Sequence, residues 1–400
     1  MSPIGDGPEG AGLLEAGPAG GTVGVIFGGP SPEHDVSILT GLQAARALVL
    51  AGRAVGSVEA VYWTKGERFV SVEPTLEAEA FVDGPPKGAR ELRFVAQPGG
   101  GFFSVKTGML GAGKERRLEL EALVNCCHGG PGEDGTLQSA LDLAGVPYTG
   151  PAAAAAALGM DKLAFGSVVE AAGLPSLPRR LVVPGLEAPV WDGAEGPYIV
   201  KPRFGGSSIG IEVINDWSDV LRYVELGGPH TQRGVVVEPY HPEAFDVQVA
   251  VRAYPALALS LFERPLRAGG PSPILSYSDK YLGGEGMVSA PRELPAQLDA
   301  GLEKELQDAA SRIASVAGAR GIWRIDFLVE GPATWWVNEV NTVPGSFAKY
   351  LWVGEAAVDF PVLLADMIAE ARRRPSVQWS SMGADGSALR SAASIAHKLG

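Results

Sequence analysis

Buried-strand patterns alternate with helical patterns in the first part of the chain. Short apolar runs at 22–27, 58–63 and 122–127 predict strands, and the first of them ends in a glycine turn. Helices are predicted from about Val36 to Ala51 and around Leu137–Ala144. Strands that alternate with helices indicate a parallel sheet wound on both sides.

The rest of the chain mixes helices with antiparallel strand patterns. Two long runs, 245–254 and 256–264, predict paired antiparallel strands, and a turn at 330–334 joins two more, 322–329 and 334–340. The other expected elements are helices at 152–158, 161–172, 296–318 and 357–373 and strands at 180–183, 197–202 and 235–239. This pattern indicates α+β lobes rather than one continuous wound sheet.

Composition narrows the class of protein. The 400 residues are 46% hydrophobic and 20% charged, which is ordinary for a globular protein of two or three domains. A formal net charge of −13 argues against a general nucleic-acid binder, although nucleotide binding needs only a few local cations. Apolar runs fall short of the roughly 20 residues that span a bilayer, and the N-terminus does not resemble a secretory signal. We therefore expect a cytoplasmic protein without membrane contact.

The two ends of the chain and the cysteines carry no expected chemistry. Residues 1–20 are rich in Gly, Pro and Ala and predict a disordered tail, and 376–400 predict a mobile one. Cys126 and Cys127 are adjacent in an apolar run, so their side chains would leave opposite faces of a strand. We expect two buried thiols rather than a disulfide.

The strand pair that ends near residue 341 carries a candidate metal site. Asp326 lies on the first strand, while Glu339 and Asn341, two positions apart, leave the same face of the second. Two carboxylates and an amide oxygen suit Mg²⁺ that also binds substrate phosphates. Arg324 shares the face with Asp326 and could stabilise an oxyanion. The residues alone also allow three polar side chains on a solvated hairpin.

A glycine–serine loop, residues 201–210, follows a predicted strand. Glycines allow a close backbone approach to phosphates, and Lys201 adds a positive charge. The lysine precedes the glycines, so the segment is not the common phosphate-binding loop in which lysine follows them. An ordinary Gly/Ser loop fits the residues equally well.

Two glycine-rich turns follow predicted strands of the parallel sheet, where ligands commonly bind. His128 lies at one of them, before a helix expected near Gly135 with Asp134 as its cap. A zinc site there is conceivable, but its spacing matches no common pattern. Glu33 lies at the other turn, where a carboxylate could also merely complement the helix dipole.

The segment 276–287 is polar and glycine-bearing, with aromatic residues and lysine interleaved. These properties suit a lid that closes over a site and excludes water, although a surface loop has the same composition.

Taken in order, these motifs resemble the D-alanine–D-alanine ligase family of ATP-grasp enzymes over roughly residues 22–373. The strings HGGPGEDGT, GMDK, KPRFGGSSIG, RID and NEVNTVPG carry the resemblance together. It implies a three-domain ATP-grasp fold of α/β and α+β type with an N-terminal wound parallel-sheet domain. The expected boundaries are a tail at 1–20, an N-terminal domain at 21–150, a central lobe at 151–238, a C-terminal lobe at 239–375 and a tail at 376–400.

The resemblance implies that ATP binds between the central and C-terminal lobes. The phosphates would meet Lys162, Lys201, Gly206 and Ser208; the adenine hinge would comprise Glu238, Pro239, Tyr240 and His241; Asp246 would meet the ribose. Two Mg²⁺ or Mn²⁺ ions would bind Asp326, Glu339 and Asn341.

The resemblance also implies a reaction through an acyl-phosphate, which an amine then attacks. Arg324 and the Gly345 N–H would stabilise the oxyanion, and Glu33, Ser207 and Tyr281 would position the first amino acid. His128 and the lid lysine Lys280 would lie beside the phosphate. Tyr281, where ester-forming relatives tend to have Phe, favours an amine as the second nucleophile.

The sequence departs from the family after NTVPG. Lys349, Tyr350 and Leu351 occupy the region where relatives place a Ser–Leu pair on the second substrate's carboxylate. The leading hypothesis is ligation of two D-alanines for peptidoglycan precursors by a homodimer. Alternatives are a dipeptide ligase with another second amino acid or amine, a non-catalytic ATP-binding regulator, and another ATP-grasp activity such as a carboxylase. The Glu33 and His128 segments disfavour the last.

Overall fold

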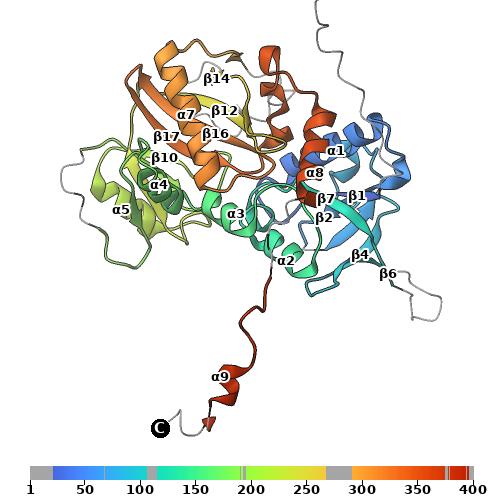
Figure 1. Ribbon diagram of the computed structural model, residues 1–400. Coiled ribbons are helices and arrows are strands. Elements are labelled where there is room, and N and C mark those ends of the chain that lie inside the picture. The colour runs from blue at the N-terminus through green and yellow to red at the C-terminus, as the bar shows by residue number, and fades with distance from the viewer. Residues whose placement is uncertain are drawn as a thin grey trace, which may run out of the picture.

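The computed structural model is described for most of the chain (Figure 1). The described residues are 21–66, 68–105, 115–189, 191, 195–266, 291–373, 377, 379–392 and 394–395. The predicted lid, with Lys280 and Tyr281, and the first tail lie outside these ranges. None of the helices in the described ranges has the length and apolar content that a membrane crossing requires.

The N-terminal sheet is mixed rather than wholly parallel. β1 (Thr22–Gly28) lies between β2 (Val58–Trp63) and β7 (Leu120–Asn125) and pairs with both in parallel, as the sequence predicted. Beyond β2 the sheet continues antiparallel through β3 (Phe69–Val72), β4 (Arg90–Val95), β5 (Gly101–Ser104) and β6 (Arg116–Arg117). The sequence did not predict this extension, because these strands are short and interleaved with charged residues.

Helices from both ends of the fold cover this sheet. α1 (His34–Leu50) and α2 (Thr136–Ala144) follow β1 and β7, respectively. α8 (Phe360–Arg373), far along the chain, packs beside α1 and β7, as Figure 1 shows. Leu363, Leu364 and Met367 of α8 share one buried core with the valines of β1. Each such buried side chain contributes about 2 kcal/mol.

The central lobe is a small antiparallel sheet with helices beside it. β9 (Tyr198–Pro202) and β11 (Val235–Pro239) lie in its middle, flanked by β10 (Glu212–Ile214) and β8 (Arg180–Val182). The helices are α3 (Ala153–Met160), α4 (Lys162–Ala171) and α5 (Trp217–Leu226). The Asp161 side chain caps α4 by accepting from the N–H groups of Leu163 and Ala164. This cap fixes the turn from which Lys162 departs.

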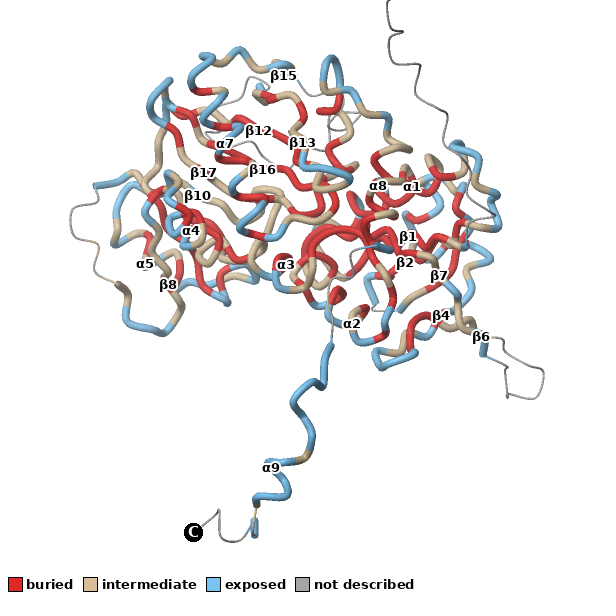
Figure 2. Tube along the Cα trace, viewed as in Figure 1, coloured by how far each residue is buried: buried red, intermediate tan, exposed pale blue. Residues whose placement is uncertain are grey.

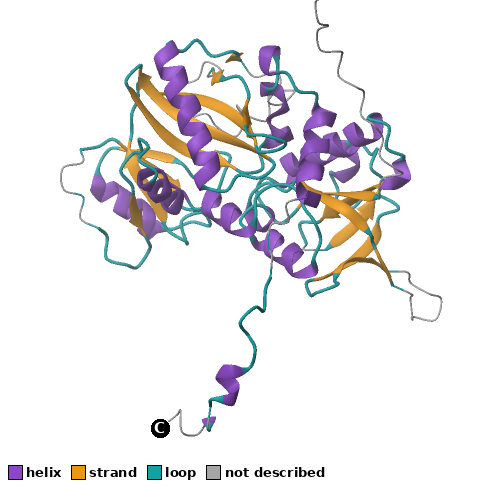
Figure 3. Cartoon of the chain, in the orientation of Figure 1, coloured by secondary structure: helices purple, strands orange, loops and turns teal. Residues whose placement is uncertain are grey.

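The C-terminal lobe is a four-stranded antiparallel sheet in the order β13-β12-β16-β17. The strands are β13 (Ala258–Leu259), β12 (Phe245–Arg252), β16 (Ile322–Gly331) and β17 (Thr334–Asn341). α7 (Ala300–Val316) covers one face of this sheet (Figures 2 and 3). Leu306 and Ile313 of the helix share a buried core with Phe327 of β16. The opposite face carries the polar residues of the candidate site.

The prediction of a long strand over 256–264 is wrong. Only Ala258–Leu259 form β13 there, and Arg264–Pro265 form β14, which pairs with β15 (Arg292–Glu293). The hydroxyl of Ser260 accepts from the Ala250 N–H at 2.8 Å and donates to the Leu261 carbonyl. A side chain that takes ladder hydrogen bonds in this way interrupts a regular strand.

The remaining elements are short. They are the 3-10 turns η1 (Val55–Ser57), η2 (Ala78–Phe81), η3 (Gly130–Gly132), η5 (Gly345–Leu351) and η6 (Gly354–Ala356), and the helix α9 (Ser387–Arg390), which lies away from the body of the molecule. Cys126 and Cys127 are free and buried, as expected.

Candidate active site

The metal candidates meet across the β16–β17 ladder. Asp326 pairs with Glu339, and Arg324 pairs with Asn341. Gln248 of β12 lies opposite Asp326 on the other side. Side chains of directly paired residues leave the same face of a sheet, so the four predicted residues share one polar surface.

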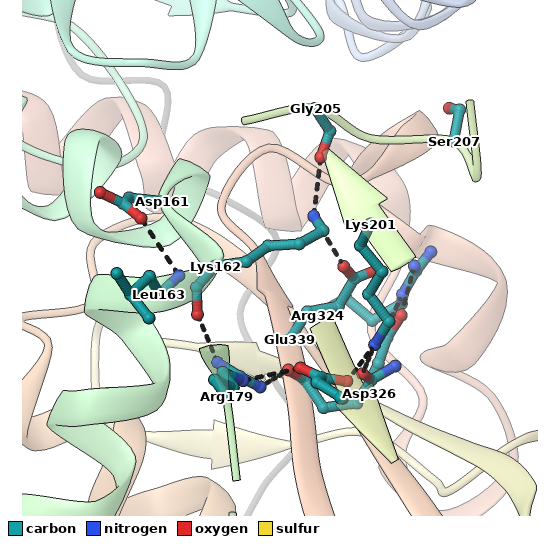
Figure 4. Close-up of polar contacts among 12 residues, drawn as sticks. Asp161, Lys162, Leu163, Arg179, Lys201, Gly205, Ser207, Arg324, Asp326 and Glu339 are labelled. Carbon is teal, nitrogen blue, oxygen red and sulfur yellow. Dashed lines mark hydrogen bonds and ion pairs between the residues drawn. The ribbon is translucent and has the colours of Figure 1, made fainter. Parts of the chain in front are cut away.

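Cations already balance both carboxylates of this surface. Arg324 donates to the two oxygens of Asp326 at 2.7 and 2.8 Å. Lys162 Nζ lies 3.1 Å from Oε2 of Glu339 and donates to the Gly205 carbonyl at 2.8 Å. Figure 4 shows Lys162 reaching between the glycine–serine loop and Glu339. The lysine therefore connects the predicted phosphate loop to the predicted metal face.

The donor set fits a magnesium ion that shares its ligands with a substrate. Within the described part of the chain, no three His, Cys, Asp or Glu side chains gather into a metal-binding group. Asp326 and Glu339 supply two carboxylates, and an amide is at hand in Asn341. Mg²⁺ prefers oxygen ligands, and in proteins it usually also binds water and phosphate oxygens. Three protein ligands leave coordination positions open for them.

Glu133 secures the end of β17 from the N-terminal domain. Its carboxylate accepts from the N–H of Gly129 at 2.9 Å and of Val343 at 3.1 Å. The Asn341 side-chain nitrogen donates to Glu133 Oε1 at 3.2 Å. The side-chain oxygen of Asn341 therefore points away from Glu133. Burial, reinforced by the nearby Glu33, raises the pKa of Glu133 to about 7. The sequence analysis did not identify Glu133, although it stands inside the HGGPGEDGT string.

His128 lies beneath the loop that follows β17. Its Nδ1 donates to the Val343 carbonyl at 2.7 Å, and Nε2 is 2.8 Å from the Thr40 hydroxyl. Thr40 in turn accepts from the Ser346 N–H at 3.0 Å. Burial lowers the pKa of His128 to about 4, so the ring is neutral at neutral pH. Both ring nitrogens are engaged, which speaks against the zinc alternative.

Arg179 and Asn338 are two residues that the sequence analysis missed. Glu238, 1% exposed, lies between the Lys201 ammonium at 2.6 Å and the Arg179 guanidinium at 2.7 Å. Lys201 also donates to the Asn338 side chain at 3.0 Å. Burial alone would raise the pKa of Glu238, but the charges of Lys201 and Arg179 outweigh it and hold that pKa below its ordinary value. No motif marked Arg179, because its partners lie on other elements.

The glycine–serine loop contacts the turn before α1. The Ser207 hydroxyl donates to Glu33 Oε1, a link between residues 174 positions apart. A Cβ at Gly129 would lie 2.5 Å from Glu33 Oε2, and one at Gly206 would lie 2.9 Å from it. A side chain at either position would press on the Glu33 carboxylate, and the left-handed φ of 63° at Gly129 favours glycine there. Ser207 and Ser208 both have left-handed backbones, with φ of 53° and 59°.

A cavity of about 200 Å³ opens beside this contact. Glu33, Gly129, Gly206, Phe204, Met160 and Arg233 are among its lining residues. The space is small for a nucleotide and adequate for a small amino acid.

The predicted adenine hinge lies at the end of β11. Glu238 turns its side chain to Arg179 and Lys201, so its backbone alone can meet a base. The Tyr240 N–H donates to the Pro197 carbonyl at 2.8 Å. The centres of the His241 and Trp336 rings lie 4.4 Å apart. Asp246 of β12 lies opposite Leu328 of β16. Pro239 ends the strand.

The loop after β17 has an unusual backbone. Gly345 begins η5, and Ser346, Phe347 and Ala348 follow in the left-handed conformation, with φ near 50°. Such a turn costs about 1–2 kcal/mol per residue and needs support. Thr40 accepts from the Ser346 N–H, and the buried Phe347 and Ala348 side chains anchor the turn in the core.

The three predicted acceptor residues point in different directions. Lys349 lies half-buried with Nζ 4.9 Å from the centre of the Phe360 ring, and burial lowers its pKa. Leu351 is buried in the core, so its side chain is inaccessible. The Tyr350 hydroxyl is buried without a hydrogen-bond partner among the described residues, and Arg324 and Asp326 are within electrostatic range of it. Tyr350 is thus the one of the three whose hydroxyl lies near the charged residues of the polar face.

Solved structures share this fold. A D-alanine-D-alanine ligase from Coxiella burnetii superposes with a TM-score of 0.70 at 21% identity, covering 89% of this chain and 95% of that one. VanG D-Ala:D-Ser ligase from Enterococcus faecalis gives 0.67 at 24% identity, covering 88% and 99%. This shared fold carries an oxygen-rich sheet face beside a lysine-flanked glycine loop, an arrangement that suits an ATP-dependent ligase of the ATP-grasp class.

Sequence comparison identifies the family. The family model for the D-ala D-ala ligase N-terminus matches residues 22–151, and that for its C-terminus matches 188–369. A D-alanine--D-alanine ligase from Rhodococcus jostii is 30% identical over 383 residues, covering 88% of this chain and 97% of that protein. One from Campylobacter lari is 30% identical over 331 residues, covering 82% and 88%. The chain belongs to the D-alanine–D-alanine ligase family.

Proposed function

We propose that this enzyme joins two D-alanine molecules through an acyl-phosphate, using ATP, to supply a dipeptide for peptidoglycan synthesis in the cytoplasm. The observation that carries the proposal is the single sheet face on which Asp326, Glu339, Asn341 and Arg324 meet. Carboxylates beside a guanidinium suit phosphoryl transfer from a nucleotide to a carboxylate followed by attack on the acyl carbon.

The polar face would hold two divalent cations, with Asp326, Glu339 and Asn341 as ligands. When bound, such ions neutralise negative charge on the phosphates during transfer. Lys162 would then leave Glu339 for a phosphate oxygen, since the metal would take over the balancing charge. Lys201, Gly206 and Ser208 would complete the phosphate contacts, and the backbone of 238–241 would meet the adenine.

The first amino acid would bind at the cavity beside Glu33. The Glu33 carboxylate suits an ammonium group, and the Ser207 contact fixes its orientation. From there the substrate's carboxylate can face the phosphate loop. Arg324 and the Gly345 N–H would stabilise the oxyanion that forms when the amine attacks. Tyr281 and Lys280 of the lid would complete the enclosure.

The second amino acid would bind under Tyr350. The Tyr350 hydroxyl, which is buried and has no hydrogen-bond partner among the described residues, can donate to the acceptor's carboxylate close to Arg324. The Arg292 guanidinium lies 4.7 Å from the centre of the Tyr350 ring and 2.9 Å from Glu263, so the tyrosine is packed in place. The same departure from the family pattern favours a second candidate, ligation of D-alanine to another small amino acid.

Product analysis distinguishes these candidates. The enzyme is incubated with ATP, Mg²⁺ and D-alanine, alone and paired with glycine, D-serine, L-alanine or D-lactate, and the products are identified by mass spectrometry. Turnover with D-alanine alone supports the proposal. Failure with D-alanine alone, combined with turnover of a mixed pair, refutes it and supports the second candidate.

The proposal also covers the domain organisation and the oligomeric state of the enzyme. We propose a homodimer whose protomers comprise an N-terminal domain at 21–150, a central lobe at 151–238 and a C-terminal lobe at 239–375. Sedimentation of the purified protein tests the dimer, because a single species of monomer mass at micromolar concentration would contradict it.

A further inference from the structure

A buried ion cluster lies under the proposed phosphate site, formed by Arg179, Lys201 and Glu238. The side chains are 5%, 6% and 1% exposed, and both cations contact the one carboxylate. The cluster therefore holds two positive charges against one negative charge. Its remaining charge of one unit lies in a region from which water is largely excluded, where electrostatic interactions are strong.

Arg179 makes three hydrogen bonds to three different elements. It donates to Glu238 on β11 at 2.7 Å, to the Lys162 carbonyl at the start of α4, and to the Asn338 carbonyl on β17 at 2.7 Å. Figure 4 shows its guanidinium between Lys162 and the polar face. This fork geometry suits arginine and holds the central and C-terminal lobes together around the nucleotide site.

Asn338 owes its position to a β-bulge. Asp326 pairs with Glu339, while the next residue, Phe327, pairs with Val337, so Asn338 is the extra residue. A bulge leaves that residue out of the ladder. Its carbonyl accepts from Arg179, and its side chain accepts from Lys201 at 3.0 Å. The bulge thus joins both cations to the strand that carries Glu339.

We infer that Arg179 is a positioning residue that neutralises Glu238, leaving the charge of Lys201 available for the nucleotide phosphates. Without Arg179, Glu238 would be balanced by Lys201 alone, and the pair would present no net charge to the ligand. The inference rests on the proposed placement of the phosphates beside Lys201.

Net charge in the cluster predicts the order of affinities in a set of variants. The cluster carries one positive charge in the wild type, none in Arg179→Met, two in Glu238→Gln and one again in the double variant. We expect Arg179→Met to weaken ATP binding about tenfold and the double variant to recover it. A purely structural role for Arg179 gives the opposite result, since the double variant would then bind no better than Arg179→Met.

Calorimetric titration of the full chain with ATP and with adenosine tests the inference, and the ratio of the two affinities is the readout. Adenosine lacks phosphates, so its affinity should stay within twofold across the set. Arg179→Lys keeps the charge without the fork, so it should preserve the ratio while lowering the melting temperature. Arg180→Met is the matched control, because Arg180 lies over the Trp191 ring, 5.5 Å from its centre, and should leave the ratio unchanged.

Two failures are distinguishable. If Lys201→Met leaves the ATP-to-adenosine ratio unchanged, the phosphates are not beside Lys201 and the proposed site is wrong. If Lys201→Met lowers the ratio while Arg179→Met does not, or if the double variant fails to recover it, the phosphate site stands and the role of Arg179 is overturned.

Discussion

Lys162 Nζ lies 3.1 Å from Oε2 of Glu339, so the predicted phosphate cation and a predicted metal ligand neutralise each other in this structure. Lys162 is fixed at its backbone by the Asp161 cap, while its long side chain can turn. The pair therefore protects a carboxylate-rich surface from self-repulsion until cations arrive. We expect metal and nucleotide to bind together. A metal ion on Glu339 would free Lys162 for a phosphate, and a phosphate on Lys162 would free Glu339 for the metal ion.

Replacing Glu339 by Gln should raise the Mg²⁺ concentration for half-maximal activity by about tenfold or more, since a charged ligand becomes a neutral one. Phosphate release measured across a Mg²⁺ titration gives the value. Glu303→Gln, in the first turn of α7 and only partly buried, is the control and should match the wild type. An unchanged Mg²⁺ dependence in Glu339→Gln would remove Glu339 from the metal site.

Replacing Ser207 by Ala should raise the KM of the first amino acid while the KM of ATP stays unchanged. The lost hydrogen bond is to a charged group, so the effect is about 1.5–3 kcal/mol, or roughly tenfold to a hundredfold. Initial rates at saturating ATP provide the measurement, with Ser167→Ala on the exposed side of α4 as the control. Equal KM values in the variant and the wild type would show that the contact between Ser207 and Glu33 plays no part in substrate binding.

Replacing Tyr350 by Phe should raise the KM of the second amino acid about fivefold or more without lowering the melting temperature. The hydroxyl has no partner in the described residues, so its removal leaves no group newly unsatisfied in the free enzyme. Kinetics with the acceptor varied and thermal unfolding test both halves. A lower melting temperature with unchanged kinetics would show that Tyr350 is structural.

Stability should respond to acid through His128. Its pKa falls from 6.5 to about 4 on folding, so between these pH values the unfolded chain binds a proton that the folded protein does not. Its contribution is complete above pH 6.5 and is lost as the pH falls towards 4, amounting to about 3 kcal/mol. Urea unfolding of wild type and His128→Asn across this range gives the difference.

Glu133 titrates in the opposite sense, because its pKa is raised, so the wild-type curve alone does not isolate the histidine. The difference between wild type and His128→Asn should shrink as the pH falls from 6.5 to 4. A constant difference over that range would mean that the histidine is not held neutral by burial.

The sequence predicted the arrangement of those candidate-site residues that lie within single motifs, while their roles stay predictions. Residues two apart on a strand share a face, so Glu339 and Asn341 were placed together correctly, and the hairpin turn located Asp326 and Arg324. The three parallel strands were also predicted, because buried apolar runs are distinctive. The ladder register, which sets Asp326 opposite Glu339, follows from the pairing and not from either strand alone.

Residues whose role depends on distant partners were missed. Arg179, Glu133 and Gln248 each contact a residue more than fifty positions away in the chain, and no local pattern separates them from ordinary polar residues. The bulge at Asn338 is equally invisible, because an extra residue is defined by the partner strand. The prediction of one long strand over 256–264 failed for a related reason. The strand is interrupted after Leu259 because the Ser260 hydroxyl accepts from the Ala250 N–H on another strand.

The position of α8 bears on how the polypeptide acquires its shape during synthesis. Arg372 of this helix donates to Glu121 of β7, 251 positions earlier in the chain. When β1 and α1 of a nascent chain have left the ribosome, α8, the helix that covers them, has not yet been synthesised. The first apolar core therefore closes late, and a product truncated before Phe360 would expose it to proteases and chaperones.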